Sequence, residues 1–156
     1  MKEIQIITEI EAKQQIIETV LRFALAFDRQ DWQMLRACLS DEIFVDYSDF
    51  RGDEPQFITA EDYVAARQTG LSGLKTQHLS TNHLVTIDGS YAECVSAFLI
   101  SRVNPNLPAD RNFLDTAGHY VHNLQCITGE WQINKIKQQV VWTRGNLEVH
   151  GAFRHK

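Results

Sequence analysis

The chain has 156 residues, of which 44% are hydrophobic, and a formal net charge of -5. A chain of this length can bury a sizeable core, so we expect a single domain over residues 1–156. An acidic chain without a basic stripe matches neither nucleic acid nor an anionic membrane, and both are excluded as partners. The expected partner is a small molecule that is neutral or weakly polar.

No apolar run approaches the roughly 20 residues that span a bilayer. The first residues, MKEIQIITEIEAKQQ, are too acidic and polar for a signal peptide, so we expect a cytoplasmic protein with no membrane contact. Cys38, Cys94 and Cys126 are an odd number with no close pair. This pattern favours reduced, mostly buried thiols over a disulfide framework or a zinc site.

Three helices are predicted in the first half of the chain. Thr8 and Glu11 have capping-box spacing ahead of a long stretch with helical period, so the first helix is expected to begin there. Asp31 is a suitable N-cap for a short second helix, and Thr59 for a third helix with the sequence EDYVAARQTGL. Residues 48–57, which contain glycine and proline, are expected to form a loop.

The other elements are predicted to be strands. Residues 43–47, IFVDY, alternate as a short strand, and from Leu74 onward apolar residues recur at every second position. Helices followed by a long curved sheet predict an α+β fold, with a cone-shaped pocket between three N-terminal helices and a mostly antiparallel sheet. The long strands are expected at residues 76–87, 91–103, 117–127 and 131–142, with turns at Asp88-Gly89 and Thr128-Gly129 and a crossover at 104–111.

A carboxylate ends the apolar stripe of the first helix. Ile17, Leu21, Ala24 and Asp28 are spaced by four, three and four residues, so they share one helix face and Asp28 points to the interior. A charge there needs a cation or a hydrogen-bond donor as its partner, because burial and the negative end of the helix dipole both raise its pKa. The alternative is a solvated Asp28 that caps the turn after the helix.

The spacing of the histidines along the predicted strands decides whether two of them can bind one metal ion. His78 and His83 are five residues apart, and His119 and His122 are three apart. Residues at odd separations face opposite sides of a regular strand, so neither pair can share a metal ion without a bulge and we expect no metal site. Even separations predict two shared faces, one with His78, Ser80 and Asn82 and one with His119, Val121 and Asn123.

Several motifs together carry a family resemblance. The run AFDRQDWQMLRACLSDEIFVDYSDF, then TQHLSTNH, and later GHYVHNL and WTRGN, resembles the SnoaL-like branch of the nuclear transport factor 2-like superfamily, and within it scytalone dehydratase. The blocks DxxDW, DYxxF and TQH carry this resemblance, which extends from the first helix to Trp142. It implies a cone-shaped α+β barrel, a buried pocket and chemistry that needs no cofactor.

The resemblance also implies roles for particular residues. Asp28 matches a carboxylate that pairs with a catalytic histidine, and His78 matches that histidine, a general base or acid. Tyr47 matches a tyrosine that polarises a substrate carbonyl. In a dry pocket we expect the carboxylate to raise the pKa of His78 above about 6.5. The substrate-binding candidates are Phe27, Phe50, His119, Asn123 and Trp142.

Two positions depart from the family pattern. Phe27 stands where the dehydratase has a tyrosine before the helix carboxylate, and no histidine occupies residues 103–105, near which the family has its second active-site histidine. The parts that remain suit dehydration, isomerisation or ring closure through an enol. The alternatives from other classes are a non-catalytic ligand carrier and a structural subunit, such as the small subunit of ring-hydroxylating dioxygenases.

The strands of the second half are apolar on both faces. In residues 91–103, for example, Val95 and Leu99 alternate with Phe98 and Ile100. Only one face can meet the helices, so the other requires cover. We therefore expect a homo-oligomer, either a dimer or a trimer.

Overall fold

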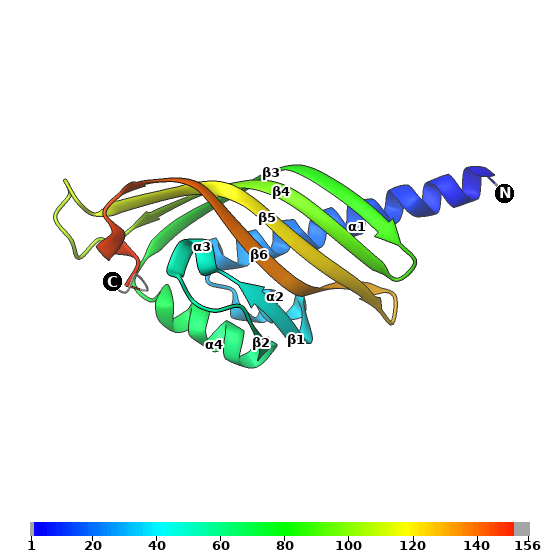
Figure 1. Cartoon of the computed structure of the whole chain (residues 1–156), viewed down its shortest axis with the longest axis horizontal. Helices are drawn as coiled ribbons and strands as arrows, with labels where there is room; N and C mark the ends of the chain where they lie inside the picture. Colours follow the sequence, from blue (N-terminus) through cyan, green and yellow to red (C-terminus); the bar gives the residue numbers. More distant parts are fainter. Residues whose placement is uncertain (1, 152–156) are drawn as a thin grey trace.

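A long first helix, α1 (Lys2–Arg29), runs along a strongly curved sheet of six strands (Figure 1). The computed structural model describes residues 2–151, and the side chains of residues 8–151. The shorter helices are α2 (Trp32–Ala37), α3 (Ser48–Arg51), α4 (Ala60–Gly70) and the 3-10 helix η1 (Leu147–Val149). Within the described residues, no helix is both long and apolar enough to cross a membrane.

The strand order of the sheet is β2-β1-β6-β5-β4-β3. Neighbouring strands are antiparallel except β1 and β6, which pair in parallel. The sheet curves without closing, and its edges are β2 and β3. The predicted α+β fold is therefore confirmed. The strands are β1 (Leu39–Asp46), β2 (Gln56–Thr59), β3 (Lys75–Asp88), β4 (Tyr91–Val103), β5 (Phe113–Ile127) and β6 (Glu130–Gly145).

The predicted caps of the short helices are present, but the predicted loop is not uniform. Asp31 accepts a hydrogen bond from the backbone N–H of Met34 at 2.9 Å, and Thr59 accepts one from Asp62 at 3.1 Å. Residues 48–57 contain the whole of α3 and the start of β2. The first strand also begins earlier than predicted, because parallel pairing with β6 extends it at its start.

The buried face of α1 differs from the predicted stripe by one position. Its buried residues include Ile16, Val20, Phe23 and Phe27, whereas Leu21 is 41% exposed. Two adjacent stripes of the helix are apolar, and the sheet covers the one that holds two phenylalanines, since this burial removes more apolar area from water. The helix also begins before Thr8, which therefore does not cap it.

A bulge in β3 overturns one argument about the histidines. The register against β4 shifts between Thr81 and Leu84, and Asn82 has a φ of 55°, a left-handed conformation that asparagine tolerates. The extra residue places His83 on the same face as His78, with its Nε2 atom 2.8 Å from the Ser80 hydroxyl. The prediction that His78 and His83 face opposite sides, with Asn82 beside His78, is wrong for this reason.

A second bulge lies between β5 and β6. The pairing register shifts between Ala117 and Gly118, whose partners are Trp142 and Val140. A Cβ atom at Gly118 would lie 1.9 Å from the backbone carbonyl oxygen of Gln139. Because this neighbour is backbone, only a shift of the strand could make room for a side chain.

We predict that Gly118→Ala lowers the free energy of unfolding by about 3 kcal/mol, the cost of overpacking at a site that cannot relax cheaply. Urea denaturation followed by circular dichroism measures this change. Gly70→Ala is the matched control, because a Cβ atom at Gly70 would meet nothing within 4 Å. Equal losses in the two variants would contradict the proposed close approach of the strands.

Candidate active site

The last turn of α1 meets β3 through Asp28 and His78. The Oδ1 atom of Asp28 lies 2.5 Å from Nδ1 of His78, and its Oδ2 atom accepts the backbone N–H of the same residue at 2.7 Å. The Thr76 hydroxyl donates to Oδ1 at 2.9 Å. The side chains of Asp28 and His78 are only 11% and 10% exposed. Asp28 thus has the buried partner that its place on the helix requires, and it does not cap the following turn.

Burial sets the protonation of this pair. It lowers the pKa of His78 below 6.5, although the Asp28 carboxylate acts in the opposite direction, and the charge of Arg102 lowers it further. The expectation of a raised pKa for His78 is therefore wrong, because it omitted the cost of burying an imidazolium. Burial raises the pKa of Asp28, but its hydrogen bonds with His78 and Thr76 bring it below the usual value.

At neutral pH, Asp28 is therefore ionised and the His78 imidazole is neutral. An ionised carboxylate accepts hydrogen bonds only, so Nδ1 of His78 carries the imidazole proton and donates it to Asp28. The Nε2 atom then keeps its lone pair. This is the tautomer that a general base requires.

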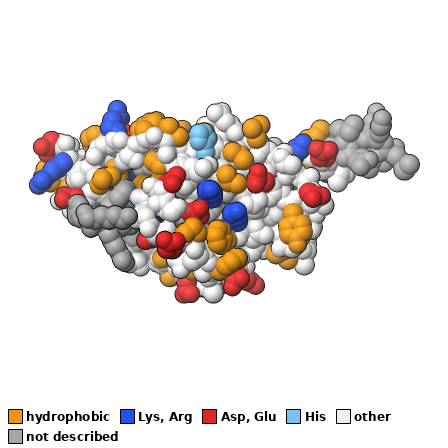
Figure 2. Space-filling view, viewed as in Figure 1, with side chains coloured by type: hydrophobic (Ala, Val, Ile, Leu, Met, Phe, Trp, Pro, Cys, Tyr) orange, Lys and Arg blue, Asp and Glu red, His pale blue; other side chains and the backbone are white. Residues whose placement is uncertain are grey.

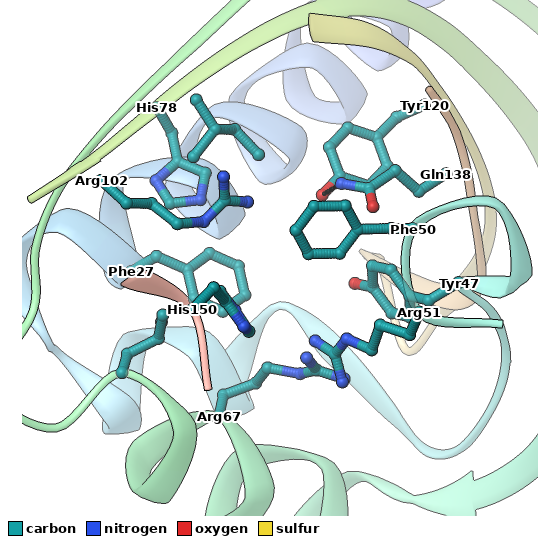
Figure 3. Close-up of a pocket in the computed structure, with 12 residues that line it drawn as sticks. Phe27, Tyr47, Phe50, Arg51, Arg67, His78, Arg102, Tyr120, Gln138 and His150 are labelled. Carbon is teal, nitrogen blue, oxygen red and sulfur yellow. Dashed lines mark hydrogen bonds between the residues drawn. The ribbon is translucent and has the colours of Figure 1, made fainter. Parts of the chain in front are cut away.

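A cavity of about 30 Å³ lies beside the imidazole (Figure 3). Of the predicted site residues, Phe27, Tyr47, Phe50 and His78 line it. The ring of Phe27 stacks on that of His78 with a centroid distance of 5.2 Å and an interplanar angle of 21°. The stacking and the Asp28 contact together restrict the imidazole to one orientation. As it stands, the cavity has room for roughly two water molecules.

Two buried tyrosines, Tyr47 and Tyr120, line this cavity, and a third, Tyr63, contacts Tyr47. The Tyr47 and Tyr63 hydroxyls are hydrogen-bonded at 2.7 Å, and Gln138 donates to the Tyr120 hydroxyl at 2.7 Å. Burial raises the pKa of all three phenols. They therefore remain protonated near neutral pH and can donate to a carbonyl or enolate oxygen.

Three predicted binding residues lie elsewhere. His119 and Asn123 are on the outer face of β5, where Asn123 donates to Glu93 at 3.4 Å. Trp142 is 46% exposed on β6. The assignment of His119, Asn123 and Trp142 to the cavity is corrected accordingly. The alternation of residues along β5 separates the two faces of the strand, but it does not show which face meets the helices. In the structure, Tyr120 and His122 face inward.

His122 is a buried histidine outside the pair. Its ring stacks on Tyr120 at 5.0 Å and meets the edge of Phe23 at 5.2 Å, and neither ring nitrogen has a hydrogen-bond partner in the described part of the chain. Burial lowers its pKa to about 3, with a smaller contribution from His83. Among residues 8–151, no group of three or more His, Cys, Asp or Glu side chains could hold a metal ion.

Three arginines also line the cavity, and sequence reasoning did not single them out. They are Arg51 at the end of α3, Arg67 on α4 and Arg102 on β4. One signal was available for Arg102. It shares its strand face with Phe98 and Ile100, two residues that are buried with it.

Comparison with known proteins matches residues 8–137 to the SnoaL-like domain. The chain belongs to this family. A scytalone dehydratase from Colletotrichum orbiculare is 26% identical over 145 residues, which cover 83% of this chain and 73% of that one. The scytalone dehydratase-like protein claB of Passalora fulva is 33% identical over 63 residues, covering 38% of this chain and only 39% of the relative.

The crystal structure of the Kfla4162 protein from Kribbella flavida has the same fold as this chain. It superposes with a TM-score of 0.81 at 22% sequence identity, and the match covers 92% of this chain and 98% of that one. At this identity the likeness establishes the fold alone. The match to the SnoaL-like domain, together with the scytalone dehydratase relative, confirms the family resemblance carried by the DxxDW, DYxxF and TQH blocks.

Acid should destabilise the protein through His122. Its pKa is 6.5 when unfolded and about 3 when folded, so the unfolded chain binds the proton more tightly between these values. The contribution of His122 to stability is complete above pH 6.5 and falls as the pH drops towards 3. We predict that His122→Phe, which keeps the ring stacking, loses less free energy of unfolding in acid than the wild type, by on the order of 3 kcal/mol.

Urea midpoints measured from pH 7 to pH 4 test this prediction. His119→Gln provides the control, since it removes an exposed imidazole from the same strand and leaves the buried His122 in place. A slope in His122→Phe equal to that of the wild type would show that His122 is not the group responsible.

Proposed function

We propose that this SnoaL-like protein is a cofactor-independent lyase of the dehydratase type that acts on a small hydroxylated carbonyl compound. The observation that carries the proposal is the buried Asp28–His78 pair beside a cavity. Isomerisation or ring closure on the same residues is the alternative, because both also begin with removal of a proton next to a carbonyl.

The geometry supports the following sequence of proton transfers. The Nε2 atom of neutral His78 takes the proton from the carbon next to the carbonyl, and the electron pair moves to the carbonyl oxygen. A phenol such as Tyr47 donates a hydrogen bond to that oxygen. The imidazolium then gives its proton to the β-hydroxyl group, the carbon–oxygen bond breaks and water leaves as the carbonyl re-forms.

Asp28 has a positioning role in this scheme. It holds the ring through Nδ1 and the strand through the backbone N–H of His78. Its negative charge also stabilises the imidazolium that forms during the reaction. The two named scytalone dehydratase relatives favour a dehydration over the other enol reactions. A non-catalytic carrier would need only apolar walls, and a buried acid/base pair gives it no advantage.

The outer face of the sheet supports the proposal that the protein is a homo-oligomer. One apolar row crosses the four long strands on the face that points away from the cavity. It consists of one residue from each of β3, β4, β5 and β6, paired in register: Leu79, Leu99, Ala117 and Trp142. Leu79 and Trp142 are 49% and 46% exposed. Figure 2 shows hydrophobic side chains among charged ones on the visible side of the molecule.

We predict that Asp28→Asn lowers kcat by a factor on the order of 10³–10⁴. The backbone N–H of His78 requires the amide oxygen, so the amide NH2 group faces Nδ1 and forces the imidazole proton onto Nε2, which can then no longer act as the base. Asp31→Asn is the matched control, because asparagine is an equally good helix N-cap. In the wild type, kcat/KM should fall in acid with an apparent pKa below 6.5.

A steady-state assay of dehydration by absorbance, over a range of pH, provides these values. Unchanged turnover in Asp28→Asn would exclude the pair from the chemistry. The carrier would then become the leading interpretation.

We predict that Trp142→Glu shifts the protein from a dimer or trimer towards the monomer, since it places a charge in the apolar row. Sedimentation velocity at micromolar concentration measures the change. Ile10→Glu is the control, as Ile10 is 62% exposed on α1 and lies far from the sheet row in the chain's fold. A wild-type protein that sediments as a strict monomer would refute the oligomer.

A further inference from the structure

Three guanidinium groups converge on one small cavity. Arg51, Arg67 and Arg102 come from α3, α4 and β4, and Figure 3 shows their side chains around the same space. The whole chain has a net charge of -5, yet among the residues that the structure describes no aspartate or glutamate lines this cavity. The nearest catalytic carboxylate, Asp28, is on the other side of the His78 ring and bonded to it. The cavity is thus a positive site inside an acidic protein.

None of these three arginines forms a salt bridge with another described residue. Arg102 is 4% exposed, and its Nη1 atom donates to the neutral Thr116 hydroxyl at 3.0 Å. The Nε atoms of Arg51 and Arg67 are buried and have no hydrogen-bond partner among the described residues. Guanidinium groups present a fork of donors that suits an oxyanion, and at least the two buried Nε–H donors have no partner here.

Aromatic rings compensate only part of this charge. The guanidinium carbons of Arg51 and Arg67 lie 5.0 and 4.8 Å from the centre of the Tyr47 ring, and that of Arg102 lies 5.0 Å from the Phe50 ring. The attraction of a cation to a ring is weaker than the cost of removing a charge from water.

Electrostatics in the cavity agree with an unmet need for negative charge. Burial lowers the pKa of Arg102 to about 10, and the nearby Arg51 acts in the same direction, whereas Tyr120 and Asp115 act in the opposite direction without cancelling the effect. Arg102 still remains charged at neutral pH. Buried charges in proteins are normally paired, so a cavity with three like charges is arranged for a ligand of opposite sign.

We propose that the substrate carries a carboxylate and that Arg51, Arg67 and Arg102 bind it. The planar fork of an arginine matches a carboxylate in a bidentate geometry. This inference deepens the proposed function, on which it rests for the chemistry at His78, and it replaces the neutral ligand expected from net charge. The small cavity limits the ligand to a compact monocarboxylate unless the arginine side chains swing aside.

Isosteric pairs of acid and amide provide the test. Acetate is compared with acetamide, and benzoate with benzamide, by isothermal titration calorimetry on the full chain. In at least one pair, the acid should bind ten or more times more tightly than the amide. This preference should fall at least tenfold in Arg67→Gln and Arg102→Gln. Arg144→Gln should keep it, since Arg144 is 73% exposed and bonded to Asp115 outside the cavity.

Arg102 is buried, so a failure to fold in that variant is checked by circular dichroism. In that case Arg67→Gln, at a partly exposed position, and Arg51→Gln provide the test. Arg51→Lys should then restore the preference for the acid over the amide. Equal binding of acid and amide in both pairs would overturn the proposal. Inorganic phosphate that binds more tightly than every carboxylate would overturn it as well, because the site would then select a tetrahedral anion.

His78→Ala separates this inference from the proposed function. Carboxylates should bind to this variant within threefold of the wild type, since the arginines hold them. In the wild-type protein, binding of carboxylates without turnover of any hydroxycarbonyl compound would refute the lyase and leave the anion site intact. Turnover of neutral substrates with no preference for acids would refute the anion site and leave the lyase intact.

Discussion

The contact between Asp28 and His78 fixes the relation of α1 to β3, and the candidate site depends on it. One carboxylate accepts a backbone N–H, an imidazole N–H and a hydroxyl from the same short strand segment. The contact therefore sets the position of the strand and the direction of the ring together. Without these donors, the carboxylate would be a costly buried charge in the last turn of a helix, where the dipole opposes it.

The sequence was sufficient for the longer helices, the long strands and this pair, but not for α3 and β2, which it predicted as loop, nor for the faces that the elements turn inward. The long strands and the caps Asp31 and Thr59 depend on local patterns, which is why they were predictable. Both α1 and β5 offer two faces of similar hydrophobicity, and only tertiary packing selects one. That choice places Tyr120 inside and His119 outside, and a single residue in αL conformation at Asn82 changes the face of His83.

Net charge was the least informative quantity about the site. A total of -5 describes the surface, where most charged side chains are solvated, whereas the described lining of the cavity contains three arginines and no acidic residue. Arg51 ends a helix of one turn, directly before Gly52, and Arg67 lies on α4 among mostly exposed residues, so neither has a sequence pattern that distinguishes it from a surface arginine. Only their convergence in space makes them a candidate binding site.

The arginines and the catalytic pair are coupled through Arg102. Burial is the main cause that lowers the pKa of His78, and the positive charge of Arg102 adds to it, so without a ligand the imidazole is neutral near pH 7. In the proposed complex, a bound carboxylate would neutralise part of that charge and raise the pKa of His78 towards its ordinary value. The base would thus become stronger when the substrate is in place. An anion site next to a buried Asp–His pair can in this way bind the substrate and also adjust the group that reacts with it.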